Sequence, residues 1–309
     1  MPVKEKLWPG PRRAGRGRSL AAALVVLLGI FGGLRAGAQS LAASPVLAWQ
    51  DIQAAAEAGR RTVLLHRLGM PVTFTAHFAV YTVDASPDDA AAAGAAAETA
   101  WTELIKQVGA PAGAFSADGE RIPLVVAGSY SDLGSLLGLQ SAGATAGAEQ
   151  DGVVYIVRPR PDGTTSAGGW AEVPLVHELV HYWLDKEAAD RYPRWFTEGL
   201  AEYAQWQATG EVLPAPADWT DAIYRPGQID RQFDSSDQAV AYREALSVVQ
   251  FMAARFGPRA PWQVAVRLHG GESFAACLED VTGGDQNALW AAWQGWLGQD
   301  MGAGVAHSP

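Results

Sequence analysis

Two histidines stand four residues apart in an otherwise apolar run, "VPLVHELVHYWL". A helix places residues i and i+4 on the same face, so the Cβ atoms of His177 and His181 would lie about 5–6 Å apart. Two imidazole nitrogens at this spacing can bind one zinc ion. Glu178 would lie on the adjacent face, within reach of water at such a site. The stretch, with its pattern HExxH, therefore predicts a helix that carries two metal ligands with a carboxylate beside them.

A catalytic zinc site needs a third protein ligand and one position open for water. "AADRYP" predicts a turn, and "RWFTEGLAEYAQW" predicts a second helix that starts near Pro193. If the two helices pack antiparallel, Glu198 returns to the level of the histidines, and Glu202, one turn on, points the same way. Asp185, four residues after His181, is interpreted as a solvated residue near the end of its helix. Glu198 is therefore the expected third ligand.

At these residues the sequence resembles the gluzincin zinc metallopeptidases of the thermolysin and aminopeptidase type, especially their small "peptidase MA-like" domains. The shared signature is "HELVH", sixteen intervening residues and then "EGLAEY". The resemblance implies one zinc ion per chain with three protein ligands: His177, His181 and Glu198. It also implies that Glu178 is the general base and that Glu202 orients a ligand histidine through its other ring nitrogen.

The activity that this resemblance implies is hydrolysis of peptide bonds. Glu178 would take a proton from zinc-activated water and later deliver it to the leaving amine. A hydrogen-bond donor must also stabilise the developing oxyanion. Tyr242 in "QAVAYREAL" is the first candidate and Tyr224 is the second, whereas Tyr182 and Tyr203 are expected to pack in the core.

Peptidases of this kind usually present an edge strand that pairs with an extended substrate. "DGVVYIVRP" is the candidate strand. The preceding "AGAEQDG" is similar to the segment with which aminopeptidases bind a substrate's amino terminus, so Glu149 would be the amine-binding residue. A flexible loop is the alternative for this Ala- and Gly-rich segment. Endopeptidase and aminopeptidase activity therefore both stay open.

The surrounding pattern favours an α+β fold, in which a small mixed sheet with one long helix precedes a mainly helical, zincin-like half. "VTFTAHFAVYTVD" predicts a strand over residues 72–83, and "RIPLVVAGS" and "DGVVYIVRP" predict two more. "SPDD" from Ser86 predicts the start of a long helix that ends at Gly109. "SAGATAGAEQ" is expected to be a flexible connection between the second and third strands. From Ala171 onward the pattern is helical, apart from a Pro- and Asp-rich stretch at 213–237.

These elements predict a division of the chain into consecutive segments. They are a signal peptide or N-terminal anchor (1–38), a helical segment (39–71), a peptidase MA-like catalytic domain (72–297, with an α/β part at 72–170 and a helical part at 171–297) and a flexible tail (298–309).

The amino terminus is typical of an exported protein. Six Lys and Arg residues within residues 1–18 precede the apolar run "SLAAALVVLLGIFGGL". A small-x-small site follows, which predicts a secretory signal cleaved after Ala38. The alternative is an uncleaved membrane anchor formed by residues 19–34. Both interpretations predict a secreted or cell-surface protein.

Charge and cysteine content limit the partners and the covalent cross-links that this chain can have. Residues 39–309 carry 16 basic and 32 acidic side chains, and this net charge of −16 argues against nucleic acid or an anionic membrane surface as a partner. Cys277 is the sole cysteine, so no intrachain disulfide can form, and an inert core thiol is expected. A peptide or protein substrate is the expected partner, and the oligomeric state stays open.

Two alternatives to a metallopeptidase remain at this stage. One is an inactive binding or scaffold protein on the same fold, and the other is a metal-dependent hydrolase of non-peptide substrates. The intact Glu178 argues against the first, because a closed structural metal site has no use for a base beside it.

Overall fold

The computed structural model describes residues 70–302, apart from gaps at 110–120, 138–145, 151, 161–168, 171–172, 189–191, 211–212 and 215. The predicted signal or anchor, almost all of the segment 39–71 and the last seven residues lie outside the described residues. All described residues belong to one compact unit of the chain. Among them, no helix combines the length and the apolar character that a membrane crossing requires.

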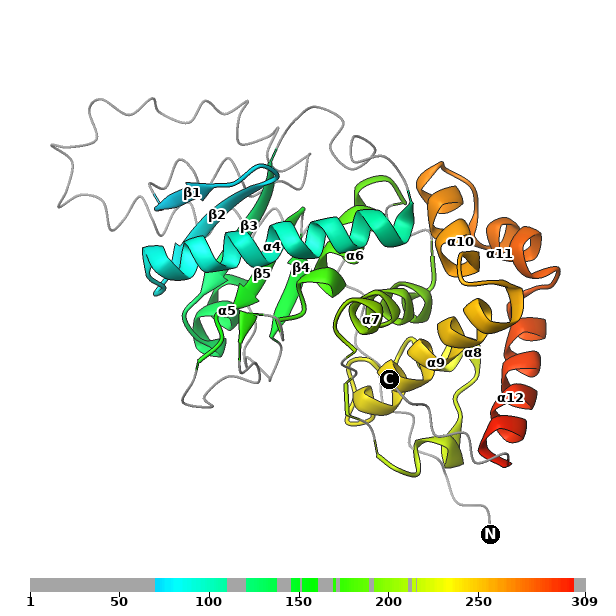
Figure 1. Cartoon of the computed structure of the whole chain (residues 1–309). Helices are drawn as coiled ribbons and strands as arrows, with labels where there is room; N and C mark the ends of the chain where they lie inside the picture. The colour runs from blue at the N-terminus through cyan, green and yellow to red at the C-terminus, as the bar shows by residue number, and fades with distance from the viewer. Residues whose placement is uncertain are drawn as a thin grey trace, which may run out of the picture. The chain divides into compact units, whose positions relative to one another are not determined.

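Five strands form one mixed sheet in the order β1-β2-β3-β5-β4 (Figure 1). They are β1 (Val72–Phe74), β2 (Phe78–Val83), β3 (Ile122–Ala127), β4 (Gly147–Gln150) and β5 (Val153–Val157). The three inner strands are parallel to one another, and the outer strands β1 and β4 run antiparallel to their neighbours. This mixed sheet, followed by helices, confirms the predicted α+β class.

The prediction of a single strand over residues 72–83 is wrong. The chain turns after β1 and folds back, so that Val72 of β1 lies opposite Tyr81 of β2. Glu98 of the long helix holds this turn, because its Oε1 accepts hydrogen bonds from the Thr75 hydroxyl and from the backbone N–H of His77. These partners are distant in sequence, which is why the alternating pattern alone did not reveal the turn.

The edge of the sheet was also assigned to the wrong strand. β5, the predicted edge strand, is paired on both sides, and β4 is the outer strand at this end of the sheet. β4 lies in the segment that was expected to be a flexible connection. Gly147 serves close packing instead, since a Cβ atom there would lie 2.7 Å from the Glu178 carboxylate.

Helices cover both faces of the sheet. α4 (Pro87–Val108) crosses one face, and α5 (Tyr130–Leu137), which the sequence analysis did not identify, packs on the opposite one (Figure 1). α4 begins and ends as predicted: Ser86 and Asp89 form a reciprocal capping box, and Gly109 ends the helix in the left-handed conformation at φ 66°. The alternation of side chains along β3 supplies one hydrophobic cluster on each face.

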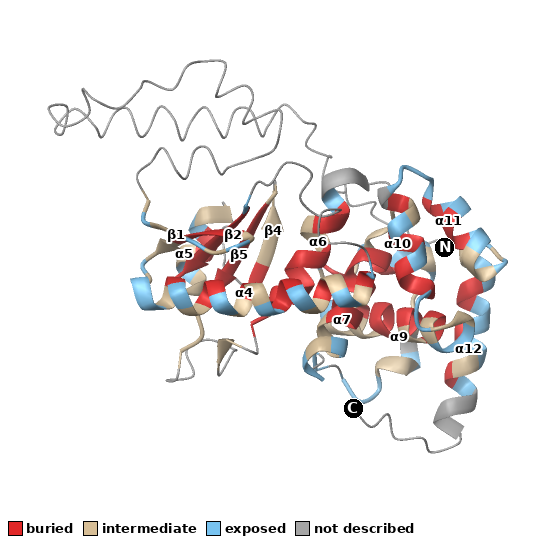
Figure 2. Ribbon diagram, turned by 45° about the horizontal axis from the view of Figure 1, so that its top comes forward, coloured by how far each residue is buried: buried red, intermediate tan, exposed pale blue. Residues whose placement is uncertain are grey.

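The second half of the described chain is helical. Its elements are α6 (Leu175–Ala188), α7 (Arg194–Thr209), the 3₁₀ turn η4 (Trp219–Ala222), α8 (Pro226–Ile229), α9 (Gln238–Phe256), α10 (Ala260–His269), α11 (Phe274–Thr282) and α12 (Gln286–Gly302). α7 packs against both α6 and α9, and the three are largely buried (Figure 2). Cys277 is buried, as expected. α12 continues past Leu297, where the flexible tail was expected to begin.

Candidate metal centre

The first pair of predicted ligands lies on α6, a helix that is buried along most of its length. Val176, Leu179 and Val180 are at most 4% exposed and fix the helix in the hydrophobic core. His177 lies among them and is also buried, and the side chain of His181 is about as enclosed. Polar groups in such surroundings are costly unless they have partners. The partners of these histidines come almost entirely from α7.

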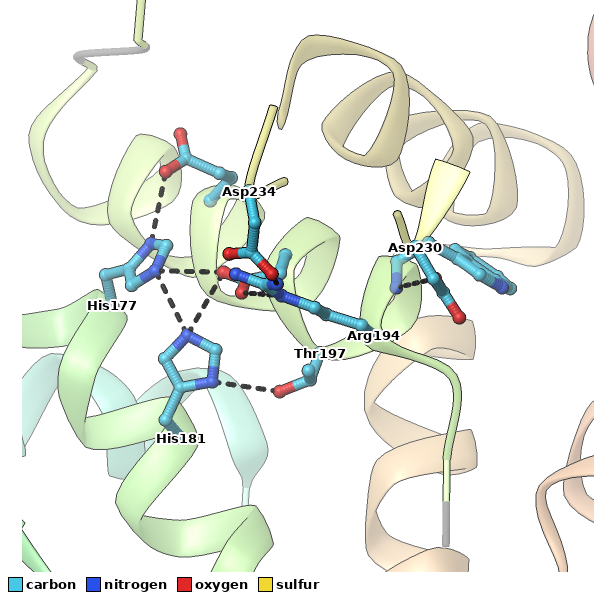
Figure 3. Close-up of polar contacts among 9 residues, drawn as sticks. His177, His181, Arg194, Thr197, Asp230 and Asp234 are labelled. Atoms are coloured by element: carbon cyan, nitrogen blue, oxygen red, sulfur yellow. Dashed lines mark hydrogen bonds and ion pairs between the residues drawn. The ribbon is translucent and has the colours of Figure 1, made fainter. Parts of the chain in front are cut away.

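Three side-chain atoms converge between α6 and α7, and Figure 3 shows the two imidazoles of His177 and His181 side by side. The Nε2 atoms of His177 and His181 lie 3.1 Å apart, and the Oε2 atom of Glu198 lies 3.6 and 3.4 Å from them, respectively. A circle through three points with these separations has a radius of about 2.0 Å, which matches the 2.0–2.1 Å bonds of zinc to imidazole and carboxylate. The three side chains could therefore hold a metal ion.

The outer nitrogen of each imidazole also has a partner on α7. His177 Nδ1 lies 3.1 Å from Glu202 Oε1, and His181 Nδ1 lies 3.0 Å from the Thr197 hydroxyl oxygen (Figure 3). Because an ionised carboxylate can only accept, His177 Nδ1 carries the hydrogen and its Nε2 keeps a lone pair for a metal. His177 contacts Glu202, whereas His181, one turn later on α6, contacts Thr197, which comes earlier on α7. The two helices are therefore antiparallel, as predicted.

The lone pairs of His177 Nε2, His181 Nε2 and Glu198 Oε2 would repel one another without a proton or a metal ion between them. A proton can take that place: burial alone would lower the pKa of His177, but hydrogen bonds to Glu198 and Glu202 raise it well above its ordinary value. Burial alone would raise the pKa of Glu198, but the charge of His181 and the hydrogen bonds to both histidines hold it well below the ordinary range. Glu198 is therefore a ready anionic ligand.

The net charge of the cluster is suited to a divalent ion. Metal binding requires both imidazoles to be neutral and the carboxylates to be ionised. In that form three buried carboxylates, Glu178, Glu198 and Glu202, lie around the imidazoles, and the Arg194 guanidinium contacts Glu198. The carboxylates then outnumber the guanidinium, so the cluster carries an excess of negative charge. Buried charges persist only when they are paired or bind metals.

Glu178 occupies the position expected of a base beside the ligands. It is buried, and burial raises the pKa of its carboxyl group, with a further rise from the charges of Glu198 and Glu202 and an opposing effect of the histidines. Its side chain rests against Gly147 of β4. The edge strand therefore borders Glu178 directly.

Tyr242, the first candidate for the oxyanion donor, has its ring beside a candidate ligand. Its ring centroid lies 6.4 Å from that of His177, and burial, reinforced by the charge of Glu198, raises its pKa well above the ordinary value. The Tyr224 hydroxyl instead donates to Asp237 at 2.6 Å. Tyr182 and Tyr203 pack against the hydrophobic core, as expected.

Glu149 lies on β4, on the same side of the strand as Gly147. Burial and a hydrogen bond with Asp185 raise its pKa to about 9, while the backbone N–H of Gly152 donates to its Oε1 at 2.8 Å. The expectation that Asp185 is merely solvated is thus incomplete: this residue is exposed, but it also accepts a hydrogen bond from the Tyr192 hydroxyl. The two carboxyl groups lie alongside β4, next to the cluster.

The sequence analysis missed two side chains that contact the ligands. Thr197 directly precedes Glu198, and Arg194 precedes it by one helical turn, so Arg194 Nε donates to Glu198 Oε1 at 3.0 Å. The i, i+4 spacing of Arg194 and Glu198 is the signal that could have identified the arginine, whereas Thr197 contacts His181 on the other helix and has no such signal.

Comparison of the sequence with models of known protein families and with curated proteins gives no match to either. The metal-binding capacity of the cluster therefore rests on its geometry and charge.

Proposed function

We propose that this protein is an exported, zinc-dependent metallopeptidase of the gluzincin type. The observation that carries the proposal is the convergence of His177 Nε2, His181 Nε2 and Glu198 Oε2 within 3.6 Å of one another, with the buried Glu178 beside them. Two imidazoles and one carboxylate are the protein ligands of catalytic zinc sites that keep a fourth position open. The basic and apolar amino terminus supports export.

When bound, zinc supplies a Lewis acid that polarises a carbonyl group and makes water more acidic. Glu178 accepts the proton of the attacking water and then delivers it to the leaving amine. Burial raises the pKa of its carboxyl group, which makes Glu178 a stronger base than a solvated glutamate. A closed structural site would gain nothing from this residue.

Tyr242 is the proposed donor to the developing oxyanion. Its ring lies next to His177, and its hydroxyl, like that of any tyrosine, is protonated at neutral pH and can donate a hydrogen bond. Burial raises the pKa of this hydroxyl further. Such a donor stabilises charge that exists only in the transition state.

β4 supports a peptide as the substrate. Val157 N–H of β5 donates to Ala146 C=O, and the register pairs Gly147 with Ile156. Because hydrogen-bonded pairs alternate in an antiparallel ladder, the backbone groups of Gly147 and Glu149 point away from β5. Within the described part of the chain no strand pairs with this edge of β4, so an extended peptide could add to it, and its scissile bond would then run past Glu178.

The test is to replace Glu178 with Gln in the full-length chain and to incubate the variant with a mixed peptide library, monitored by mass spectrometry. E178Q should retain zinc and lose peptide cleavage, whereas E279Q, on the exposed surface of α11, should behave as wild type. Zinc binding without any cleavage by the wild-type chain would favour a scaffold or a non-peptide hydrolase. Cleavage by E178Q at the wild-type rate would refute the proposed mechanism.

The same library separates endopeptidase from aminopeptidase activity. Glu149 shares its environment with Asp185, and its raised pKa means that an incoming ammonium group would have to displace a proton. If cleavage occurs only next to free amino termini and is lost in E149A, Glu149 binds the substrate's amine. Cleavage within peptides that persists in E149A would exclude that role.

A further inference from the structure

Arg194 contacts a ligand carboxylate but has no part in the proposed reaction. It is the first residue of α7, one turn before Glu198, and its Nε donates to Glu198 Oε1 at 3.0 Å. The other oxygen, Oε2, is the one that faces His177 and His181. The two oxygens of the carboxylate are thus divided between the guanidinium and the candidate metal position.

The Arg194 guanidinium makes two further contacts, with Asp234 and Phe233. Its Nη1 donates to Asp234 Oδ2 at 2.8 Å, and its central carbon lies 5.0 Å from the ring centroid of Phe233. Phe233 is buried and packs edge-on against Tyr242, whose ring in turn lies next to His177. These contacts form a closed ring of side chains from Glu198 back to His177.

The segment that follows α8, which contains Phe233 and Asp234, also holds the start of α7. Pro193 occupies the position before the helix and provides no side-chain cap. The Asp230 carboxylate, which is distant in sequence, caps the helix instead: its Oδ1 accepts a hydrogen bond from the backbone N–H of Trp195 at 2.8 Å (Figure 3). Asp230 and Asp234 therefore hold the first turn of α7 at two points, which fixes where Arg194 stands.

We propose that Arg194 is a positioning residue that restricts Glu198 to a single ligating oxygen. A glutamate without this contact can rotate, and it can offer both oxygens to one ion. A charge-assisted hydrogen bond from a rigid guanidinium prevents both movements. The consequence is three protein ligand atoms and one position left open for water. The inference rests on the proposed function only in requiring that a metal ion occupies the site.

The test compares R194M with a matched control, R121M, in the full-length chain. Arg121 also donates one hydrogen bond through Nε, to Thr75 C=O at 2.7 Å, and also lies over a phenylalanine ring, that of Phe74. Metal-free protein is titrated with zinc(II) against a chromophoric chelator, and the visible spectrum of the cobalt(II)-loaded protein is recorded. Loss of a partner that orients a ligand typically weakens metal binding about 10- to 100-fold.

R194M should show that loss, together with weaker cobalt absorption, because a second carboxylate oxygen raises the coordination number. R121M should change the affinity by less than about twofold, within the effect of removing a surface arginine. R194K should also weaken binding by at least about fivefold, because an ammonium group is a point charge that cannot reproduce the guanidinium fork. R194K decides the question if R194M does not fold.

Unchanged zinc affinity and an unchanged cobalt spectrum in R194M would overturn the inference. Wild-type affinity in R194K would overturn it as well, because charge rather than geometry would then suffice. Failure of the wild-type chain to bind zinc is a different result, since it would refute the proposed function itself.

Discussion

Replacing Gly147 with Ala tests where the proposed base lies without altering any ligand. The added methyl group would stand 2.7 Å from Oε1 and 2.9 Å from Cγ of Glu178. Ordinary contacts of this kind are about 3.5 Å or longer. β4 is held by its pairing with β5, in which Gly147 lies opposite Ile156, so the strand cannot easily withdraw. Glu178 must therefore move by roughly 0.5–1 Å to restore normal contacts.

A displacement of this size has a large effect on a group that must reach a water molecule. Misplacement of a reacting group by about 1 Å can reduce a rate by about 100-fold. We expect kcat/KM of G147A to fall about 10- to 100-fold, a loss of about 1.4–2.7 kcal/mol of transition-state stabilisation. Zinc affinity should stay within about twofold of the wild-type value, because the three nearest atoms to the new methyl group all belong to Glu178.

The assay is the initial rate of cleavage of a peptide selected from the library, with a zinc titration of the same preparation. Ala148→Gly is the control, since it removes an atom from the same strand on the side that faces away from Glu178. A wild-type rate in G147A would show that Glu178 does not act from this position. A large loss of zinc affinity would show that the substitution disturbs the ligands, contrary to the geometry.

Three further outcomes are expected. Gly199→Ala should lower the free energy of unfolding by about 1–3 kcal/mol in urea, because its Cβ would lie 2.5 Å from the backbone oxygen of Ala245. Burial raises the pKa of Glu244 to about 8 from an ordinary 4.5, so the folded state binds more protons between these values. Stability should fall as pH rises from 4.5 to 8, by up to about 4 kcal/mol, and the urea unfolding of E244Q should lack this loss. Glu202→Gln should weaken zinc binding about tenfold or more in the chelator titration, because His177 loses a charged partner at Nδ1.

Local signals predicted the helices around the site well. The apolar spacing and the proline before α6, together with the turn before α7, placed His177, His181 and Glu198 on adjacent helices. The capping residues at Ser86 and Gly109 gave the bounds of α4 correctly. These features depend on neighbours within one or two turns, so the sequence alone contains the information.

Features that depend on distant partners were not predicted. The turn between β1 and β2 is held by Glu98 of α4, and the strand character of β4 comes from pairing with β5. The contact of Arg194 with Asp234 joins segments 40 residues apart. Composition favoured a loop for the Ala- and Gly-rich β4, because small residues have low strand propensity, but close packing against Glu178 requires a glycine at position 147.

Anomalous diffraction at the zinc absorption edge, from crystals of the full-length chain grown with zinc(II), tests the metal centre most directly. We expect one strong peak about 2.0–2.1 Å from His177 Nε2, His181 Nε2 and Glu198 Oε2. A map without zinc at that point, or a Glu198 side chain turned away from both imidazoles, would contradict the account.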